Sequence, residues 1–430
     1  MRAGFAKVCI TPPAGSPLSG FRARLGPSTG VHDDLYVRTL VLISGSQRVA
    51  LLSAEVLALA GDTVRLIRER IGRRYGLLPA DILVAATHTH SGPITLRTFF
   101  NEDEVPDPGY LEHVIEACAK AVEQALQDSF EGEVGIGHCE VEGVGVNRRD
   151  PSSDAVDRQA AVLRIDEAGK TRAAVVIYGC HPTVLGFANH LVSGDYPAAA
   201  IAQMEAALGP DSFAMFFNSA AANISSGHSA ELNLAGISNG DRSFEHAEVL
   251  GGRLAMAVLS ALPGIATVTS PMLETGLLTI TLNGRSYPDL QTLETAREAA
   301  RNTASSFPPA DPQARAAQMR EVYAAIDLNN ARRLLSQGGR IPVEIHAIRL
   351  HETVLLGIAG EVFAETSLAL KAKLGNRVFL ICPANGYAGY LPPEEAFAQG
   401  GYEATVAGCA PDSEAKILAA AVALDKLVRA

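Results

Sequence analysis

Tryptophan, basic charge clusters and long apolar runs are missing from this sequence. Its 430 residues include no tryptophan, and 36 lysines and arginines stand against 47 aspartates and glutamates, a formal net charge of −11. An acidic surface repels phosphate polyanions, so neither nucleic acid nor an anionic membrane is an expected partner. No run reaches the roughly 18 apolar residues of a transmembrane helix. The N-terminus, MRAGFAKVCITPPAG, has no apolar signal region, so we expect a cytoplasmic protein.

Cysteine is sparse and unpatterned. The chain contains no CxxC pair, and its six cysteines are Cys9, Cys118, Cys139, Cys180, Cys382 and Cys409. In a chain of this size without a signal segment, free buried thiols are more typical than disulfides.

Segments with strand-like and helix-like patterns alternate along the chain, which indicates an α/β fold. The expected strands are Leu35–Gly45, Val49–Leu57, Ile82–Ala86, Glu133–Glu142, Ala160–Ile165, Ala173–Tyr178, Phe213–Phe217, Val343–Leu350 and Thr353–Ile358. The expected helices are Asp62–Tyr75, Tyr110–Leu126, Ala198–Leu208 and Asp412–Val428.

Residues 286–340 differ from their surroundings, because they are rich in alanine, arginine, glutamate and glutamine around a Pro-Pro break. This composition predicts two helices that leave the core. No internal sequence repeat and no clean linker is visible. We therefore expect residues 1–430 to form a single α/β domain, with a mixed β-sheet core flanked by helices and a helical insertion near residues 286–340.

Histidines follow two of the expected strands. His88 and His90 come directly after Ile82–Ala86 and before a Gly-Pro turn, and His181 follows Ala173–Tyr178 and precedes a proline. In an extended backbone, residues two apart point to the same side, so one ring can bind metal while the other orients a substrate. The alternative is that these histidines are ordinary polar residues at strand ends. For His181 taken alone, a functional role and this structural one are equally good interpretations.

Five other residues carry chemically capable side chains near turns. Glu361 follows a strand, where a carboxylate is either a metal ligand or a first-turn helix acid. Tyr390 and Tyr402 lie near glycines, and such tyrosines pack at surfaces or donate to an oxyanion. Arg148 is a substrate contact or an ordinary ion pair. Ser225 is a nucleophile or a cap, and no GxSxG surrounds it.

Taken together, these segments resemble the catalytic domain of the neutral/alkaline non-lysosomal ceramidases. The resemblance spans roughly residues 4–405, and THTHSGP and CHPT are its most specific parts. The matching segments, in chain order, are GVHDDLYVR, ATHTHSGP, GVNRR, CHPTVLG, FNSAAANISS, AGEVF, ANGYAGYLP and QGGYE.

The resemblance implies one zinc ion per chain and assigns roles to particular residues. The implied metal ligands are His88, His181, Glu361 and Tyr390. His90, Tyr390 and Ser225 are implied to be catalytic, while Arg148, Tyr402 and His90 are implied to bind substrate. The implied reaction is hydrolysis of an amide (N-acyl) bond in a small-molecule or lipid-like substrate, by water that zinc activates. The Tyr390-to-Tyr402 spacing favours Tyr390 over Tyr387 as the ligand.

The sequence departs from the family pattern at one turn, where Ala222-Asn223 replaces Gly-Asp and no proline follows Ser225. The family's C-terminal immunoglobulin-like domain and its secretion signal are also not seen, and no tryptophan can anchor the protein at a lipid interface. Two alternatives therefore stay open. The same zinc site can hydrolyse another linkage (ester, lactone or glycosidic) of a small polar substrate, or the chain is a non-catalytic binding protein. A homo-oligomer is possible on this sequence.

Overall fold

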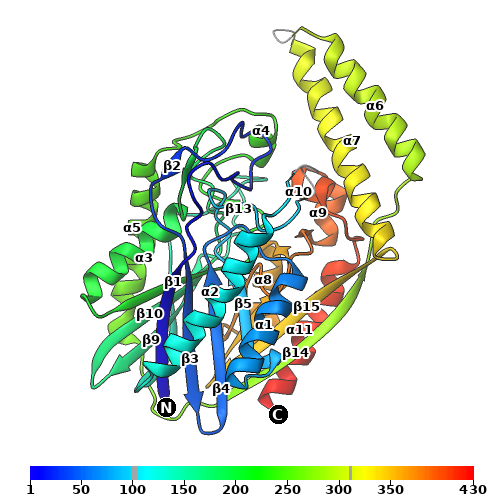
Figure 1. Ribbon diagram of the computed structural model, residues 1–430. Helices are drawn as coiled ribbons and strands as arrows, with labels where there is room; N and C mark the ends of the chain where they lie inside the picture. The colour runs from blue at the N-terminus through cyan, green and yellow to red at the C-terminus, as the bar shows by residue number, and fades with distance from the viewer. Residues whose placement is uncertain (99–103, 309–311) are drawn as a thin grey trace.

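One order of strands and helices occurs three times in the computed structural model, which describes residues 1–98, 104–308 and 312–430. Each unit runs strand–strand–strand–helix–strand–helix (Figure 1). The first unit comprises β1 (Arg2–Cys9), β3 (Tyr36–Ser44), β4 (Gln47–Ala54), α1 (Gly61–Tyr75), β5 (Ile82–Ala86) and α2 (Pro108–Gln127). The second comprises β7 (Glu133–Glu140), β9 (Gln159–Glu167), β10 (Lys170–Tyr178), α3 (Asp195–Leu208), β12 (Phe213–Asn218) and α5 (Phe244–Ala261). The third comprises β14 (Leu273–Asn283), β15 (Arg340–Leu350), β16 (Thr353–Ile358), α8 (Ala364–Leu374), β18 (Val378–Ile381) and α11 (Ser413–Arg429).

The three sheets also share one strand order. Their orders are β5-β4-β3-β1-β6, β12-β10-β9-β7 and β18-β16-β15-β14, where β6 (Phe130–Glu131) extends the first sheet. In every unit the first three strands are antiparallel, and the fourth lies parallel to the third. A parallel neighbour requires a crossover, which α1, α3 and α8 supply. The third and fourth strands of each unit therefore end on the same side of their sheet.

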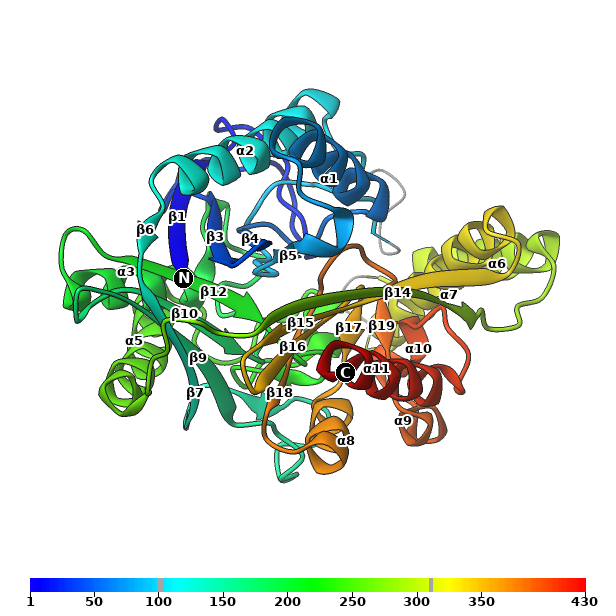
Figure 2. The ribbon, with the colours of Figure 1, turned by 90° about the horizontal axis from the view of Figure 1, so that it is seen from below.

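Alternation of side chains along the strands divides the core in two. On β10, Val176 packs beneath the helices of its own unit, whereas Val175 points into a core shared by all three sheets. Leu52 and Leu51 on β4 divide in the same way. This follows from the two-residue period of a strand. Seen along the strands, the three sheets surround the shared core, and each carries its helices on its outer face (Figure 2).

Short elements gather at the end of the molecule opposite both termini, where Figure 1 shows β2, β13, α4 and α10. These elements are β2 (Gly30–Val31), β8 (Val146–Asn147), β11 (Leu191–Val192), β13 (Ile224–Ser225), β17 (Glu361–Val362), β19 (Tyr390–Leu391), α4 (Ala230–Leu234), α9 (Glu394–Gln399) and α10 (Tyr402–Val406). The short strands form the pairs β2–β11, β8–β13 and β17–β19, which tie loops of different parts of the chain together.

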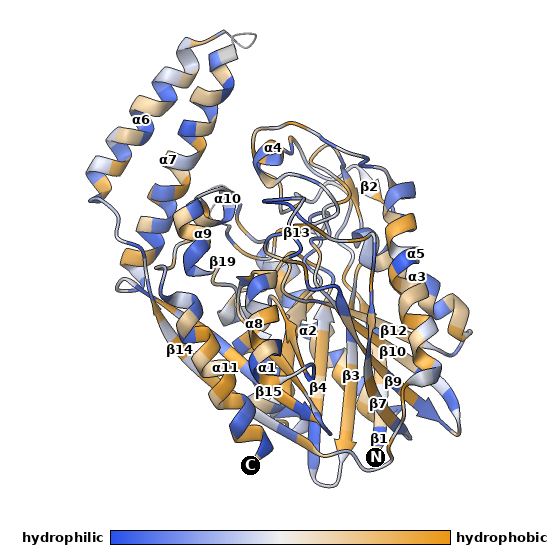
Figure 3. Ribbon diagram, turned by 180° about the vertical axis from the view of Figure 1, so that it is seen from behind, coloured by the Kyte–Doolittle hydropathy of each residue, from blue (hydrophilic) through white to orange (hydrophobic). Residues whose placement is uncertain are grey.

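The helical insertion forms an arm made of α6 (Leu290–Ser306) and α7 (Pro312–Ser336). It joins β14 to β15 and extends away from the sheets, with a more polar surface than the strands (Figure 3). Leu293 on α6 packs against Leu328 and Ala331 on α7. An ion pair of 3.4 Å between Arg22 and Glu321 connects the arm to the loop between β1 and β2.

Most of the sequence-based expectations of fold are confirmed. The mixed α/β class, the β3–β4 hairpin, the strand Ile82–Ala86 and the two-helix insertion are all present, although Pro309 of the predicted break lies outside the described residues. The helix expected from Ala198 begins at Asp195, because the Asp195 carboxylate accepts hydrogen bonds from the backbone nitrogens of Tyr196 and Leu185. All six thiols are free, but Cys9 is exposed, contrary to expectation. Among the described helices, none is long and apolar enough to cross a membrane.

His346 on β15 predicts how stability changes with pH. The ring is fully buried, Nε2–H donates to Ala80 O at 2.7 Å, and burial lowers its pKa to about 3. The unfolded chain binds this proton near pH 6.5 and the folded chain does not, so its stabilising contribution is complete above pH 6.5 and is lost as the pH falls toward 3. We expect His346→Gln to reduce the slope of unfolding free energy against pH by about 1.4 kcal/mol per pH unit between about pH 6 and 4.

Urea denaturation at pH 7, 6, 5 and 4 measures this slope. The exposed His113, replaced by glutamine, is the matched control and should leave the slope unchanged. An equal slope in wild type and His346→Gln would show that His346 is not buried as a neutral ring.

Candidate metal centre and adjoining cleft

Three histidines and one glutamate meet where strands of all three units end. His88 and His90 follow β5 of the first unit, His181 follows β10 of the second, and Glu361 lies directly after β16 of the third. The three imidazoles each offer a nitrogen, and these nitrogens lie within 4.8 Å of one another. Glu361 Oε2 lies 3.1 Å from His181 Nε2 and 3.4 Å from His88 Nε2. The parallel ends of the strands therefore bring together residues up to 273 positions apart.

The protein backbone fixes the orientation of each imidazole. Nδ1–H of His88 donates to Leu57 O at 2.7 Å, that of His181 to Ala221 O at 2.6 Å, and that of His90 to Gly20 O at 3.0 Å. A carbonyl oxygen can only accept, so Nδ1 carries the hydrogen and Nε2 presents a lone pair in the neutral ring. Carbonyl partners of this kind orient histidine ligands in metal sites.

The backbone at His88 is unusual, because its φ of 72° lies in the left-handed region. A side chain with a Cβ atom rarely adopts this conformation, which costs of order 1–3 kcal/mol. Strain of this size is retained where the surrounding structure requires one orientation of a side chain. Here it turns the chain sharply after β5, so that His88 and His90 both reach the cluster.

The cluster contains polar atoms without hydrogen-bond partners. Nε2 of His88, His90 and His181 and Oε2 of Glu361 are all buried and make no hydrogen bond. Each unpartnered buried group costs about 1–3 kcal/mol. Three lone pairs and a carboxylate oxygen satisfy a cation together, and ligands about 2.1 Å from a tetrahedral zinc ion are about 3.4 Å apart, close to the glutamate–histidine distances. The residues present therefore fit a divalent metal ion.

The electrostatics of the cluster favour ligation. Burial lowers the pKa of His181 to about 4 and holds that of His90 well below its ordinary value, so both rings are neutral at pH 7. Burial acts to raise the pKa of Glu361, but the facing His88 and His181 lower it well below the ordinary value. Neutral imidazoles and an ionised carboxylate are the protonation states that bind a cation.

Two tyrosines flank the glutamate in different ways. Tyr387 donates its hydroxyl hydrogen to Glu361 Oε1 at 2.5 Å, which leaves Oε2 for the cluster. Tyr390 pairs with Glu361 in the parallel β17–β19 ladder, so both side chains point to the same side. Burial raises the pKa of the Tyr390 phenol, and its hydroxyl accepts a hydrogen bond from Arg148 Nη2 at 3.1 Å. Tyr390 thus lies beside the cluster, and Tyr387 holds Glu361 in place.

Arg148 is held by a buried network. Its Nε donates to Glu403 Oε1 at 2.8 Å and its Nη2 to Ala222 O at 2.6 Å, while Arg149 bonds the other oxygen of Glu403 at 2.9 Å. Burial acts to lower the pKa of Arg148, and Tyr390 and Glu403 together raise it above the ordinary value. The guanidinium also lies over the ring of Tyr402. The structure therefore brings Arg148, Tyr390 and Tyr402 together.

Ser225 occupies a turn rather than the cleft. Its hydroxyl donates to His228 O at 2.8 Å and accepts from His228 N at 3.1 Å, and the residue is fully buried. This bonding matches the structural alternative. The neighbouring Asn223 donates to Glu365 at 2.8 Å and accepts from Ala364 N at 2.9 Å, and an aspartate could not make the first of these bonds. Asn223, which stands where the family pattern has aspartate, therefore suits the neighbouring Glu365 carboxylate.

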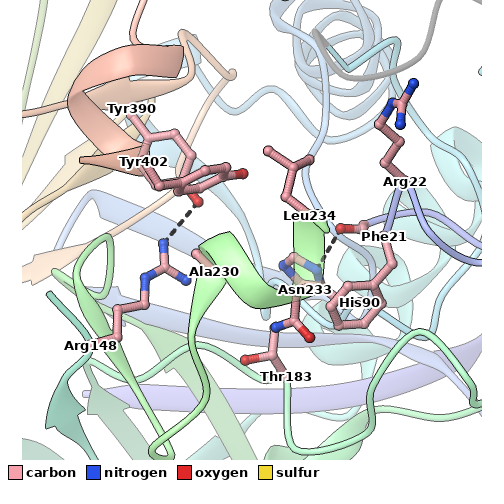
Figure 4. Close-up of a pocket in the computed structure, with 11 residues that line it drawn as sticks. Phe21, Arg22, His90, Arg148, Thr183, Ala230, Asn233, Leu234, Tyr390 and Tyr402 are labelled. Atoms are coloured by element: carbon pink, nitrogen blue, oxygen red, sulfur yellow. Dashed lines mark hydrogen bonds between the residues drawn. The ribbon is translucent and has the colours of Figure 1, made fainter. Parts of the chain in front are cut away.

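A cleft of about 40 Å³ opens onto this cluster (Figure 4). Figure 4 shows Arg148, Tyr390 and Tyr402 along one side and His90 with Phe21 on the other. Among the described residues, His90 is the one member of the four-residue cluster that also lines the cleft. Its ring therefore belongs both to the cluster and to the cleft wall. The cleft is lined by Gly20, Phe21, Arg22, His90, Arg148, Thr183, Ala230, Asn233, Leu234, Tyr390 and Tyr402.

Sequence reasoning missed several contributors. Tyr387 was set aside as a ligand, and its bond to Glu361 was not foreseen. Glu403 follows Tyr402 directly in the sequence, so an acid next to a predicted substrate contact was the available signal. Arg24 holds the backbone of His90 through a 2.8 Å bond to its carbonyl, and Phe21 packs on the His90 ring. These two lie in a loop without any motif, so nothing in the sequence identifies them.

The fold and the cluster define an α/β protein with a histidine- and carboxylate-based site able to hold a metal ion. The chain belongs to the neutral/alkaline non-lysosomal ceramidase family, whose N-terminal sequence profile matches residues 2–238. That match includes His88, His90, Arg148, His181 and Ser225 but ends before Glu361.

Named relatives agree with this assignment. The chain is 27% identical over 203 residues to "Neutral ceramidase" of Mycobacterium tuberculosis, covering 42% of this chain and 32% of that protein. It is 29% identical over 133 residues to "Neutral ceramidase A" of Dictyostelium discoideum, covering 27% and 18%. The matched part is thus a third or less of either relative's length.

Solved structures show the same fold over nearly the whole chain. The crystal structure of neutral ceramidase from Pseudomonas aeruginosa superposes with a TM-score of 0.76 at 19% identity, covering 98% of this chain and 73% of that one. A structure described as ceramidase complexed with C2 gives 0.74 at 19% identity, covering 100% and 75%. At this identity the likeness establishes the fold.

Metal content tests the cluster directly. After zinc loading and gel filtration, we expect about one zinc ion per wild-type chain and almost none in His88→Ala or His181→Ala, because each variant lacks one of the few protein ligands of the site. Elemental analysis measures this, and the exposed His113→Ala is the control. Metal retained in both cluster variants would show that the ion, if any, binds elsewhere.

Tyr387→Phe tests the support of Glu361. Loss of the hydroxyl leaves Oε1 without its 2.5 Å donor, and we expect zinc affinity to fall about 10–100-fold with the fold intact. Competition with a fluorescent zinc chelator measures the affinity, and Tyr75→Phe, on α1, is the matched control. An unchanged affinity in Tyr387→Phe would mean that Tyr387 does not position Glu361.

Proposed function

We propose that this protein is a metal-dependent hydrolase, with zinc as the first candidate ion, that cleaves an amide (N-acyl) bond. The observation that carries the proposal is the set of four unpartnered buried polar atoms on His88, His90, His181 and Glu361, next to a cleft. Family membership supports hydrolysis, and the relatives bear the name neutral ceramidase. The proposed ligands are His88, His181 and Glu361, with Tyr390 beside them.

A metal ion held here supplies Lewis-acid chemistry, since it lowers the pKa of water and polarises a carbonyl oxygen. His90 also reaches the cluster, so the described geometry permits it to act as a fourth ligand. Its position on the cleft wall favours the role that the sequence suggested. Its Nε2 carries a lone pair, so it can accept a proton from the attacking water and then pass that proton to the leaving nitrogen.

Tyr390 and Arg148 are placed to assist at the substrate carbonyl. Arg148 Nη2 donates to the Tyr390 oxygen, and burial raises the pKa of the phenol, so Tyr390 keeps its hydrogen at pH 7. Donors fixed before the reaction stabilise a developing oxyanion without reorganisation. Arg148 and Tyr402 hold polar groups of the substrate at the same side of the cleft.

A catalytic role for Ser225 has the least support, because its hydroxyl already donates to His228 O and accepts from His228 N within the turn. We propose a structural role for Ser225 in which it fixes the turn that also positions Ala222 against Arg148. The cytoplasmic location and a homo-oligomeric state stay predictions of the sequence.

A substrate panel tests the proposed bond. The zinc-loaded protein should release amine from at least one N-acyl amide in a panel that includes short-chain ceramide, and chelation should lower the rate by at least about a hundredfold, because the ion supplies the main activation of water. Amine release is followed by fluorescence. Restoring zinc after chelation is the control.

The same panel contains esters, lactones and glycosides, so each outcome has a meaning. A preference for one of these would show that the bond is assigned wrongly while the metal-dependent hydrolase stands. Full activity after complete metal removal would refute metal dependence. Tight zinc binding without turnover of any compound would favour a binding protein.

A further inference from the structure

A second cavity adjoins the cleft. It measures about 290 Å³ against about 40 Å³ for the cleft, and the two share the walls formed by Arg148, Ala230 and Tyr402. We call this second cavity the polar recess. A ligand that reaches the metal cluster through the cleft therefore has room for its bulkier part beyond Arg148, in the recess.

The lining of the polar recess is almost wholly polar. Ala230 and Tyr402 are its apolar contributors among the described residues, and the rest of its wall includes Arg149, Asp150, Glu231, Gln399 and Glu403. Burying a long alkyl chain against such a wall gains little, because the same contact removes polar groups of the wall from water. The recess is therefore suited to a ligand with hydrogen-bonding groups.

Charge in the recess disfavours an ionic ligand. Glu403 is bonded to Arg148 through one oxygen and to Arg149 through the other, so these groups already satisfy one another. Asp150 and Glu231 add two negative charges, so the two arginines and three acids of the recess sum to only −1 and favour neither sign of ligand charge strongly. A hydroxyl group both donates and accepts, so neutral polyols match walls that offer arginine donors and carboxylate or amide acceptors.

The other side of the cleft is small and partly apolar. Phe21 and Leu234 line it, and Phe21 lies against the ring of His90 with 4.9 Å between ring centroids. In the described structure, the space there admits only a short apolar group. The cleft and recess together therefore describe an asymmetric ligand, with a small acyl end at Phe21 and a larger hydroxylated end beyond Arg148.

We propose that the polar recess binds a neutral, polyhydroxylated group, and that the substrate is a short-chain N-acyl derivative of an amino sugar or amino polyol. This inference rests on the proposed amide hydrolysis. In that reaction water adds its oxygen to the carbonyl carbon, the carbon–nitrogen bond breaks, and a proton from water passes to the nitrogen. The products are a short carboxylic acid and a free amino sugar or amino polyol.

Two amides with the same acyl group separate the recess from the reaction. N-acetylglucosamine carries a hydroxylated amine, and N-hexylacetamide carries an apolar one of similar length. For the zinc-loaded full chain, we expect kcat/KM for N-acetylglucosamine to exceed that for N-hexylacetamide by at least about tenfold. One or two hydrogen bonds between the sugar hydroxyls and the recess account for a difference of this size. Acetate release measures both reactions.

Variants of the recess test its part in this preference. Glu231→Ala and Gln399→Ala should each lower the ratio of the two kcat/KM values by about three- to tenfold, mainly through the KM for N-acetylglucosamine. Both side chains lie at the surface end of the recess, so the fold should tolerate their loss. Glu394→Ala, on the same helix α9 as Gln399 but outside the recess, is the matched control and should change neither rate.

The outcomes distinguish the two proposals. Equal or faster cleavage of N-hexylacetamide, or an unchanged ratio in both variants, would overturn the recess proposal while amide hydrolysis stands. If neither amide is cleaved, calorimetric titration with N-acetylglucosamine decides. If N-acetylglucosamine binds to the wild type and binds more weakly to Gln399→Ala, the recess proposal is supported although this compound is not hydrolysed. If it does not bind at concentrations up to about 10 mM, the recess proposal is overturned.

Discussion

Three imidazole nitrogens and a carboxylate oxygen are buried without partners at a single point, and much of the surrounding structure serves to keep them there. Each histidine is turned by a carbonyl acceptor, on Leu57, Ala221 or Gly20, and Glu361 by the hydroxyl of Tyr387. Left unsatisfied, such groups cost about 1–3 kcal/mol each. A bound cation would satisfy all four atoms at once. The left-handed backbone at His88 is a further local cost of the same arrangement.

The threefold repetition of strand order explains how distant residues reach this point. In each unit a crossover helix makes the fourth strand parallel to the third, so that both strands end on one side. Packing the three sheets around a shared core then brings three such ends together. The units differ in the segment between their first and second strands. That segment carries Phe21 in the first unit, Arg148 in the second and the α6–α7 arm in the third. The repeated framework supplies position, and the segments of the first two units contribute Phe21 and Arg148 to the cleft.

A second network, centred on Glu403, connects the cleft to the recess. One carboxylate holds two adjacent arginines, and Arg148 in turn holds the Tyr390 hydroxyl and the Ala222 carbonyl. Buried ion pairs of this kind contribute little net stability but strongly oppose other arrangements, because removing one partner leaves a buried charge. The network therefore specifies the orientation of Arg148 and Tyr390 rather than adding to the stability of the fold. The Ala222-Asn223 turn, which departs from the family pattern, is part of this network through its carbonyl.

The sequence by itself determined the α/β class, most of the strands and helices, and the residues His88, His181 and Glu361 as chemically capable strand ends. It could do so because hydrophobic periodicity and turn residues are local signals. Only the tertiary structure decided that the three units share one topology, that His90 joins the cluster, and that Tyr387 supports Glu361 while Ser225 closes a turn. Much of this arrangement depends on contacts between segments far apart in the sequence, which are 66 positions apart for Arg24 with His90 and 255 for Arg148 with Glu403. No local pattern encodes such contacts, since they arise when the sheets pack.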